Sequence, residues 1–115
     1  MNNQETIDYI REHVTPGDRL AQVAEEACEL AQAVLKLKRA YEDRNPTNIS
    51  MDDAYDNVME EWADLTVACT VAFGSGDDVV FPNHPWNLRQ IAEMTWHKLE
   101  RWATRLTLHK RGDHK

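Results

Sequence analysis

The chain has 115 residues, of which 42% are hydrophobic and 29% charged, and its formal net charge at pH 7 is −7. This length predicts a single domain, residues 1–115, and is short enough for partner chains to complete the core. The acid excess argues against binding to a nucleic-acid polymer, which needs Lys and Arg to neutralise phosphates. No apolar run approaches the roughly 18 residues that suggest a membrane span, and the polar, acidic N-terminus is unlike a signal peptide. We therefore expect a soluble, cytoplasmic domain without a membrane partner.

The cysteine and histidine content excludes several kinds of site. Cys28 and Cys69 are too few for a disulfide scaffold or a cysteine-built zinc site. Both lie inside apolar runs, so we expect two buried free thiols in a reducing compartment. No Glu-x-x-His sequence occurs, which argues against a di-iron carboxylate bundle.

Helix-capping residues mark the starts of the expected helices. Asn2 predicts a first, short helix over residues 3–13, and Thr15 followed by Pro16 predicts a second helix. Nothing breaks this second helix before residue 43, and the Asn-Pro pair that follows ends it.

The second half of the chain predicts two more helices. Ser50 caps a third helix that ends at Gly74, and a fourth runs from about residue 86 or 88 to residue 108. Residues 74–86 combine Gly, Pro, Asp and Asn, which is typical of a loop and leaves a lid as one interpretation. Residues 110–115 are expected to form a mobile basic tail. Because no strand-like alternation occurs, the predicted fold is all-α, a bundle of three long helices plus a short N-terminal helix.

Acidic residues lie among apolar residues on two of these helices. The second helix has an unusually wide apolar arc, which predicts packing against another subunit in an oligomeric bundle. Glu26 lies at one edge of this arc, and Glu29 follows one turn later on the same side. Glu61 lies in the middle of the apolar stripe of the third helix, with Asp64 one turn further on. An acid in a core stripe needs a partner, because an unpaired buried carboxylate is costly.

The fourth helix carries basic residues on its apolar face. Lys98 and Arg105 share that face, and Arg101 is one turn from Lys98, so two helices point acids inward and a third points bases inward. Four converging carboxylates need a compensating cation, and an all-oxygen donor set favours Mg²⁺ or Mn²⁺ over zinc. Bound Mg²⁺ often joins a substrate phosphate, whose other oxygens the bases could hold. Alternatively, the acid pairs are ordinary solvated pairs, or the bases form salt bridges with them.

The paired acid motifs also resemble a known family. Glu25-Glu26-x-x-Glu29, a spacer of 31 residues and Glu61-x-x-Asp64 resemble the signature of the MazG-like nucleotide pyrophosphohydrolases, an all-α group. The resemblance covers about residues 15–108 and is nearest to short phage and bacterial members. The spacer is slightly longer than is usual in the family, and we interpret it as a longer loop. No pattern for one particular base is found, so the preferred base stays open.

The resemblance implies an enzyme that hydrolyses a nucleoside triphosphate to the monophosphate and pyrophosphate, for nucleotide-pool clearance. It implies a homodimer or homotetramer that depends on Mg²⁺, with Mn²⁺ as a substitute. The resemblance also implies that Glu25 orients or deprotonates the attacking water. Alternatively, Glu25 is a solvated neighbour of the metal ligands. Trp86, at the junction of loop and fourth helix, is a candidate for stacking on the nucleobase, with ordinary packing as the alternative. The implied Mg²⁺ ligands are Glu26, Glu29, Glu61 and Asp64, and the implied phosphate-binding residues are Lys98, Arg101 and Arg105.

Two other functions fit the same sequence. The first is a non-catalytic helical interaction module, in which the acid pairs are salt-bridged to Lys98 and Arg101. The second is a nucleotide sensor of the same fold that binds nucleotide without hydrolysing it.

Overall fold

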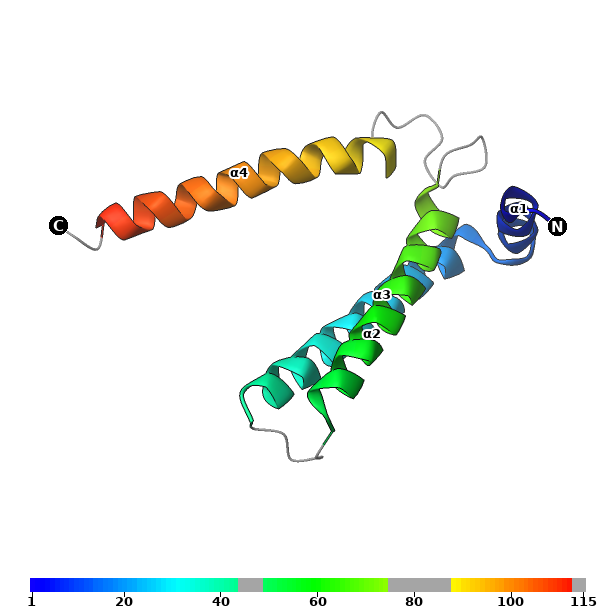
Figure 1. Ribbon diagram of the computed structural model, residues 1–115. Coiled ribbons are helices and arrows are strands. Elements are labelled where there is room, and N and C mark those ends of the chain that lie inside the picture. Colours follow the sequence, from blue (N-terminus) through cyan, green and yellow to red (C-terminus); the bar gives the residue numbers. More distant parts are fainter. Residues whose placement is uncertain (44–48, 75–87, 113–115) are drawn as a thin grey trace.

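The structure of the protein is a computed structural model that describes residues 1–43, 49–74 and 88–112. These residues form four α-helices and no strand (Figure 1), which confirms the all-α prediction. The predicted loop beyond Gly74, including Trp86, lies outside the described residues. The helices are α1 (Asn3–His13), α2 (Pro16–Tyr41), α3 (Met51–Phe73) and α4 (Leu88–Gly112).

The capping residues expected from the sequence start the first three helices. In each case a side-chain oxygen accepts a hydrogen bond from the backbone N–H three residues later, at 2.8 Å for Asn2, 3.1 Å for Thr15 and 3.0 Å for Ser50. These bonds satisfy donors that lack a partner within the helix. The end of the fourth helix was predicted wrongly. Residues 110–112 continue α4 instead of forming a tail, because no Gly or Pro precedes Gly112 in this stretch.

The core of the molecule is the contact between α2 and α3, which pack side by side as an antiparallel hairpin (Figure 1). Its buried residues are small, and no large side chain among the described residues is fully buried. A two-helix layer can bury only one stripe of each helix, so much of the apolar surface of this hairpin stays exposed. The buried apolar residues are Ala33, Ala54, Val58, Ala68, Val71 and Ala72.

A buried arginine fixes α1 against the end of α3. The Arg11 side chain is only 5% exposed, and its Nε and Nη2 donate hydrogen bonds to the carbonyl oxygens of Val71 and Thr70 at 2.9 and 3.2 Å. The last carbonyls of a helix generally lack an intrahelical partner, although that of Thr70 also accepts a hydrogen bond from the backbone N–H of Gly74 at 2.9 Å. A cation at this end also interacts favourably with the helix dipole. A β-carbon at Gly74, the residue that ends α3, would come within 2.7 Å of Arg11 Nη2. The β-carbon would meet the backbone carbonyl oxygen of Thr70 more closely still, and this contact with fixed backbone explains the glycine.

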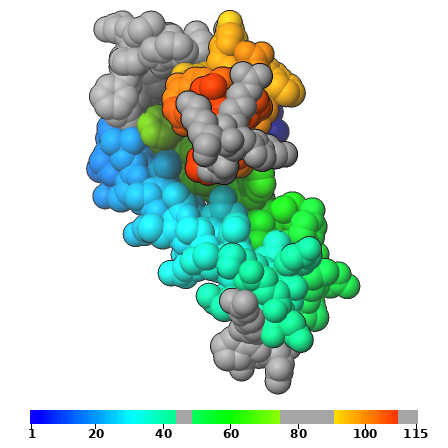
Figure 2. Space-filling view, turned by 90° about the vertical axis from the view of Figure 1, so that its left-hand side faces the viewer, coloured from blue at the N-terminus to red at the C-terminus, as the bar shows by residue number. Residues whose placement is uncertain are grey.

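The fourth helix leaves the hairpin and extends away from it (Figure 1). Figure 2 looks at the molecule from the C-terminal end of α4, with the hairpin running downward from it. The radius of gyration is 18.7 Å, against about 13 Å for a compact chain of this length. Trp96 and Trp102 on α4 are 68% and 64% exposed. One chain therefore does not form the predicted bundle, because the apolar face of α4 has no partner within the described part of it.

The expectation of two buried thiols is wrong. Both cysteines are free, but Cys28 is exposed and Cys69 is only partly buried. Consecutive apolar residues in a helix point in all directions around it. The apolar run in α2 therefore does not show which of its residues packs against α3. Burial nevertheless raises the pKa of the Cys69 thiol. None of the described helices is both long enough and apolar enough to span a membrane.

Candidate metal centre

Three of the four predicted metal ligands come together between α2 and α3. Glu26 and Glu29 lie one turn apart on α2, and the packing of the hairpin brings Glu61 of α3 beside them. One carboxylate oxygen from each of the three lies within 4.8 Å of the others. We call Glu26, Glu29 and Glu61 the acid cluster.

Two oxygens of the acid cluster are buried without a hydrogen-bond partner. They are Oε2 of Glu26 and Oε2 of Glu61. The other oxygen of Glu26 accepts a hydrogen bond from Gln22 Nε2 at 2.7 Å. A buried, unpaired carboxylate oxygen is costly, so its retention calls for a ligand or a proton. A set of carboxylate oxygens is the kind of donor set that Mg²⁺ and Mn²⁺ prefer, and the residues present therefore fit such an ion.

The electrostatics of the acid cluster also favour a cation. Burial raises the pKa of the Glu26 carboxyl above its ordinary value, and the negative charge of Glu29 raises this pKa further. Asp64 acts in the same direction, while the hydrogen bond from Gln22 lowers the pKa. A divalent cation would reverse the effect of the neighbouring acids, because it stabilises the ionised carboxylates.

Asp64 approaches the acid cluster from a groove rather than belonging to it. Its side chain is exposed, and it lines a groove of about 350 Å³ between α1, α2 and α3 together with Glu26. The walls of this groove are largely apolar, and Ile10, Val67 and Val71 contribute to them. The fourth predicted ligand is therefore near Glu26, on the solvent side of the site.

The structure does not bring the predicted phosphate-binding residues to the acids of the same chain. Lys98, Arg101 and Arg105 are exposed on α4, which extends away from the hairpin (Figure 1). The expectation that α4 points its bases toward the acids is therefore not met within one chain. Among the described residues, none of these three bases forms a salt bridge with the acid cluster. Glu25 is exposed next to the cluster on α2.

The sequence-based interpretation missed a buried arginine in the groove. Arg19 is 5% exposed, lines the groove beside Asp64, and donates a hydrogen bond from Nε to the carbonyl oxygen of Val14 at 3.1 Å. A signal for it was present. Arg19 lies on the same face of α2 as Val23 and Glu26, at the four- and three-residue spacing of a buried stripe. It places a positive charge close to the acids.

The raised pKa of Glu26 predicts a pH dependence for the cation-free protein. A folded-state pKa above the unfolded value means that the folded protein holds this proton more tightly than the unfolded chain does. The stability that Glu26 contributes is therefore complete below the ordinary Glu pKa and is lost as the pH rises through the raised value. We expect the melting temperature without divalent cations to fall, relative to a Glu26→Gln variant, as the pH rises from about 4 to 7.

The matched control for this pH series is Glu25→Gln, which changes the exposed neighbour of Glu26. Its melting temperatures should follow the wild type across the series. If the Glu26→Gln protein also followed the wild type at every pH, the carboxyl would not be the perturbed group described above.

Comparison with protein-family models, curated proteins and solved structures finds no match for this chain. The family resemblance therefore stays a prediction from the two acid motifs. The case for a function rests on those motifs and on the geometry of the acid cluster.

Proposed function

We propose that the chain is a Mg²⁺-dependent nucleoside triphosphate pyrophosphohydrolase of the MazG-like type. It would cleave a (d)NTP to the (d)NMP and pyrophosphate, and thereby clear nucleotides from the cytoplasmic pool. The observation that carries this proposal is the acid cluster, with two buried carboxylate oxygens that have no hydrogen-bond partner. The three residues of the acid cluster thus come from the two acid motifs that predict a metal site. Their carboxylate oxygens are the donor atoms that Mg²⁺ prefers.

The residues of the chain have distinct roles in this proposal. Glu26, Glu29 and Glu61 would hold the cation, with Asp64 joining them from the groove. When bound, Mg²⁺ neutralises phosphate charge and lowers the pKa of a coordinated water. Glu25 would orient the attacking water or accept its proton. Lys98, Arg101 and Arg105 would bind phosphate oxygens and stabilise the charge that develops on the leaving pyrophosphate.

The groove beside the acid cluster supports the binding of a small organic ligand. Its volume of about 350 Å³ and its largely apolar walls, with a few polar groups, are typical of small-molecule sites. A substrate whose phosphates meet the cation has room to lay its nucleoside against these walls. The assembly we propose is a homodimer or homotetramer, because the described part of one chain leaves large apolar side chains on α4 exposed.

The test is pyrophosphate release from a panel of canonical and modified NTPs and dNTPs, with and without Mg²⁺. We expect release from at least one nucleotide, and none when EDTA removes the cation. A nucleotide that raises the melting temperature but is not hydrolysed would indicate a sensor instead. If neither Mg²⁺ nor any nucleotide changed the melting temperature, the chain would be an interaction module, since ligands that bind the folded state stabilise it.

A further inference from the structure

We propose that two copies of the chain exchange their fourth helices, so that α4 of each copy packs on the exposed apolar face of α3 in the other. The exposure, length and charge of the two helix faces support the docking itself. Only its consequence for substrate binding rests on the proposed function.

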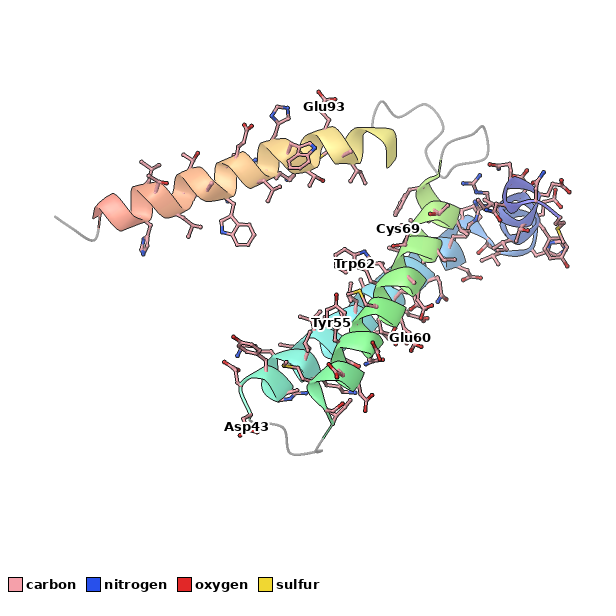
Figure 3. All side chains as sticks on the ribbon, in the orientation of Figure 1. Asp43, Tyr55, Glu60, Trp62, Cys69 and Glu93 are labelled. Carbon is pink, nitrogen blue, oxygen red and sulfur yellow. The ribbon has the colours of Figure 1, made fainter. Side chains whose placement is uncertain are left out.

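The first docking surface is a row of apolar side chains along α3. Tyr55, Met59 and Trp62 follow one another at intervals of four and three residues and are 53%, 39% and 58% exposed. Figure 3 shows Tyr55 and Trp62 on the same side of α3 as Cys69, and Glu60 on the opposite side. We call Tyr55, Met59, Trp62 and Cys69 the α3 stripe. Large apolar side chains in a continuous exposed row are typical of an interface.

The second surface is a matching row on α4. Ile91, Leu99, Trp102 and Leu106 fall within one quarter of the helix circumference and are 49%, 45%, 64% and 59% exposed. We call these four residues the α4 stripe. Glu93 lies on the other side of α4, on the edge that faces away from the hairpin (Figure 3).

The two stripes match in length. At 1.5 Å per residue, Ile91 to Leu106 spans about 22 Å and Tyr55 to Cys69 about 21 Å. Each stripe can therefore cover the other, and Met51, one turn before Tyr55 and 50% exposed, extends the apolar row on α3 by one further turn.

The charges of the two helices are complementary, and this identifies the occupant of the α3 stripe. α3 carries six acidic residues and no Lys or Arg, whereas α4 carries six Lys and Arg and two Glu. Pairing α3 with α4 brings helices of opposite net charge together, whereas pairing α3 with α3 would place two acidic helices side by side. Like charges across an interface disfavour that association, so α4 is the partner that the α3 stripe selects.

The direction of α4 indicates that the α4 covering this stripe belongs to a second copy, and the exposed area of the chain is large enough for such an interface. The chain exposes 9283 Å², whereas a compact monomer of its mass exposes about 6,500 Å². The excess of about 2,800 Å² is comparable to the share that one chain contributes to a large obligate homodimer interface. Because α4 extends away from its own hairpin (Figure 1), its stripe is presented to another molecule. A reciprocal exchange about a two-fold axis would cover all four stripes.

Helix exchange would also bring basic residues to the hairpin that carries the acid cluster, from which they are separated within one chain. Each hairpin that carries an acid cluster would receive a partner helix that carries Lys98, Arg101 and Arg105. Substrate binding would then require the dimer, and the monomer would lack the basic half of the site.

The first test measures the mass of the protein in solution by light scattering. We expect twice the chain mass of 13.3 kDa for the wild type, and a single chain mass for Trp102→Glu, which places a charge in the α4 stripe. The matched control is Trp96→Glu, because Trp96 is equally exposed on α4 but lies outside the stripe. It should stay dimeric. A monomeric wild type, or equal dissociation of both variants, would overturn the proposal.

The second test asks which copy supplies α4. Met59→Cys and Leu99→Cys lie near the middle of the two stripes, so they meet in either helix orientation. In a background with Cys28→Ser and Cys69→Ser, each is placed on a differently tagged copy, and the co-purified proteins are treated with a short bis-maleimide. We expect a cross-linked dimer that carries both tags. If the two cysteines in one chain formed only an internal cross-link, α4 would fold back on its own hairpin, and the exchange would be wrong. Neither test depends on enzymatic activity, so failure of the proposed function would not affect them.

Discussion

Replacing Glu61 by Gln is expected to abolish both the stabilisation of the protein by Mg²⁺ and the release of pyrophosphate. Glu61 contributes one of three carboxylate oxygens that lie within 4.8 Å of one another, and its Oε2 is buried without a partner. A Gln side chain has nearly the same shape but no charge, so it removes the attraction for the cation while keeping the packing. Wild-type protein at a Mg²⁺ concentration of 100 times Kd should gain about 2.7 kcal/mol of stability, and the variant close to none. Thermal unfolding across a Mg²⁺ titration measures the difference.

The control for this variant is Glu60→Gln, which removes the same charge from the adjacent residue. Glu60 is exposed on the side of α3 away from Trp62 (Figure 3), so it should retain the Mg²⁺ response and the activity of the wild type. Equal losses in both variants would indicate a general effect of charge on α3 instead of a site. A Glu61→Gln protein that kept the Mg²⁺ response and turnover would remove Glu61 from the metal centre.

Replacing Arg11 by Met is expected to lower the free energy of unfolding by about 2–4 kcal/mol, because hydrogen bonds from a charged donor contribute about 1.5–3 kcal/mol each. The Met side chain keeps much of the apolar bulk but donates nothing to the carbonyls of Thr70 and Val71 at the end of α3. The buried carbonyl of Val71 would lose its side-chain donor, whereas that of Thr70 would keep the hydrogen bond from the backbone N–H of Gly74. Denaturant unfolding gives the change as a shift in midpoint, and an unaltered slope would show that the folded state is otherwise intact.

The control is Glu12→Met, at the exposed neighbouring position on α1. A surface substitution of this kind usually changes stability by less than about 0.5 kcal/mol. The same midpoint for Arg11→Met and the wild type would mean that Arg11 does not anchor α1. Loss of that anchor would also loosen the α1 wall of the groove beside Asp64, and the substrate affinity of the Arg11→Met protein should fall with it.

Much of the helical structure follows from local signals in the sequence. Asn2, Thr15 and Ser50 can accept a hydrogen bond from the first turn of a helix, and each does so here. The convergence of Glu26 and Glu61 follows from their place on stripes that two adjacent helices must bury against each other. Such signals are local in the chain or depend on helix periodicity alone. They can therefore be recognised without knowledge of the tertiary structure.

Other features depend on contacts that periodicity does not identify. Arg11 and Arg19 are buried because carbonyl oxygens at helix ends accept their hydrogen bonds, and a charged residue in an apolar stripe is easily taken for a surface residue. Cys28 shows the opposite error, since it lies in an apolar run yet is exposed. The apolar face of α4 is evident in the sequence, but an amphipathic pattern shows that a face is buried and not which partner buries it. The direction of α4 was for this reason not predictable.

The central claim is that the acid cluster binds a divalent cation, and the binding of Mn²⁺ in place of Mg²⁺ tests it most directly. Free Mn²⁺ is measured by its electron paramagnetic resonance signal while the protein is titrated, and Mg²⁺ is then added as competitor. The prediction is saturable binding of at least one ion per chain, displaced by Mg²⁺, lost in Glu61→Gln and kept in Glu60→Gln. An undiminished Mn²⁺ signal with wild-type protein, or equal binding by the Glu61→Gln variant, would contradict the claim.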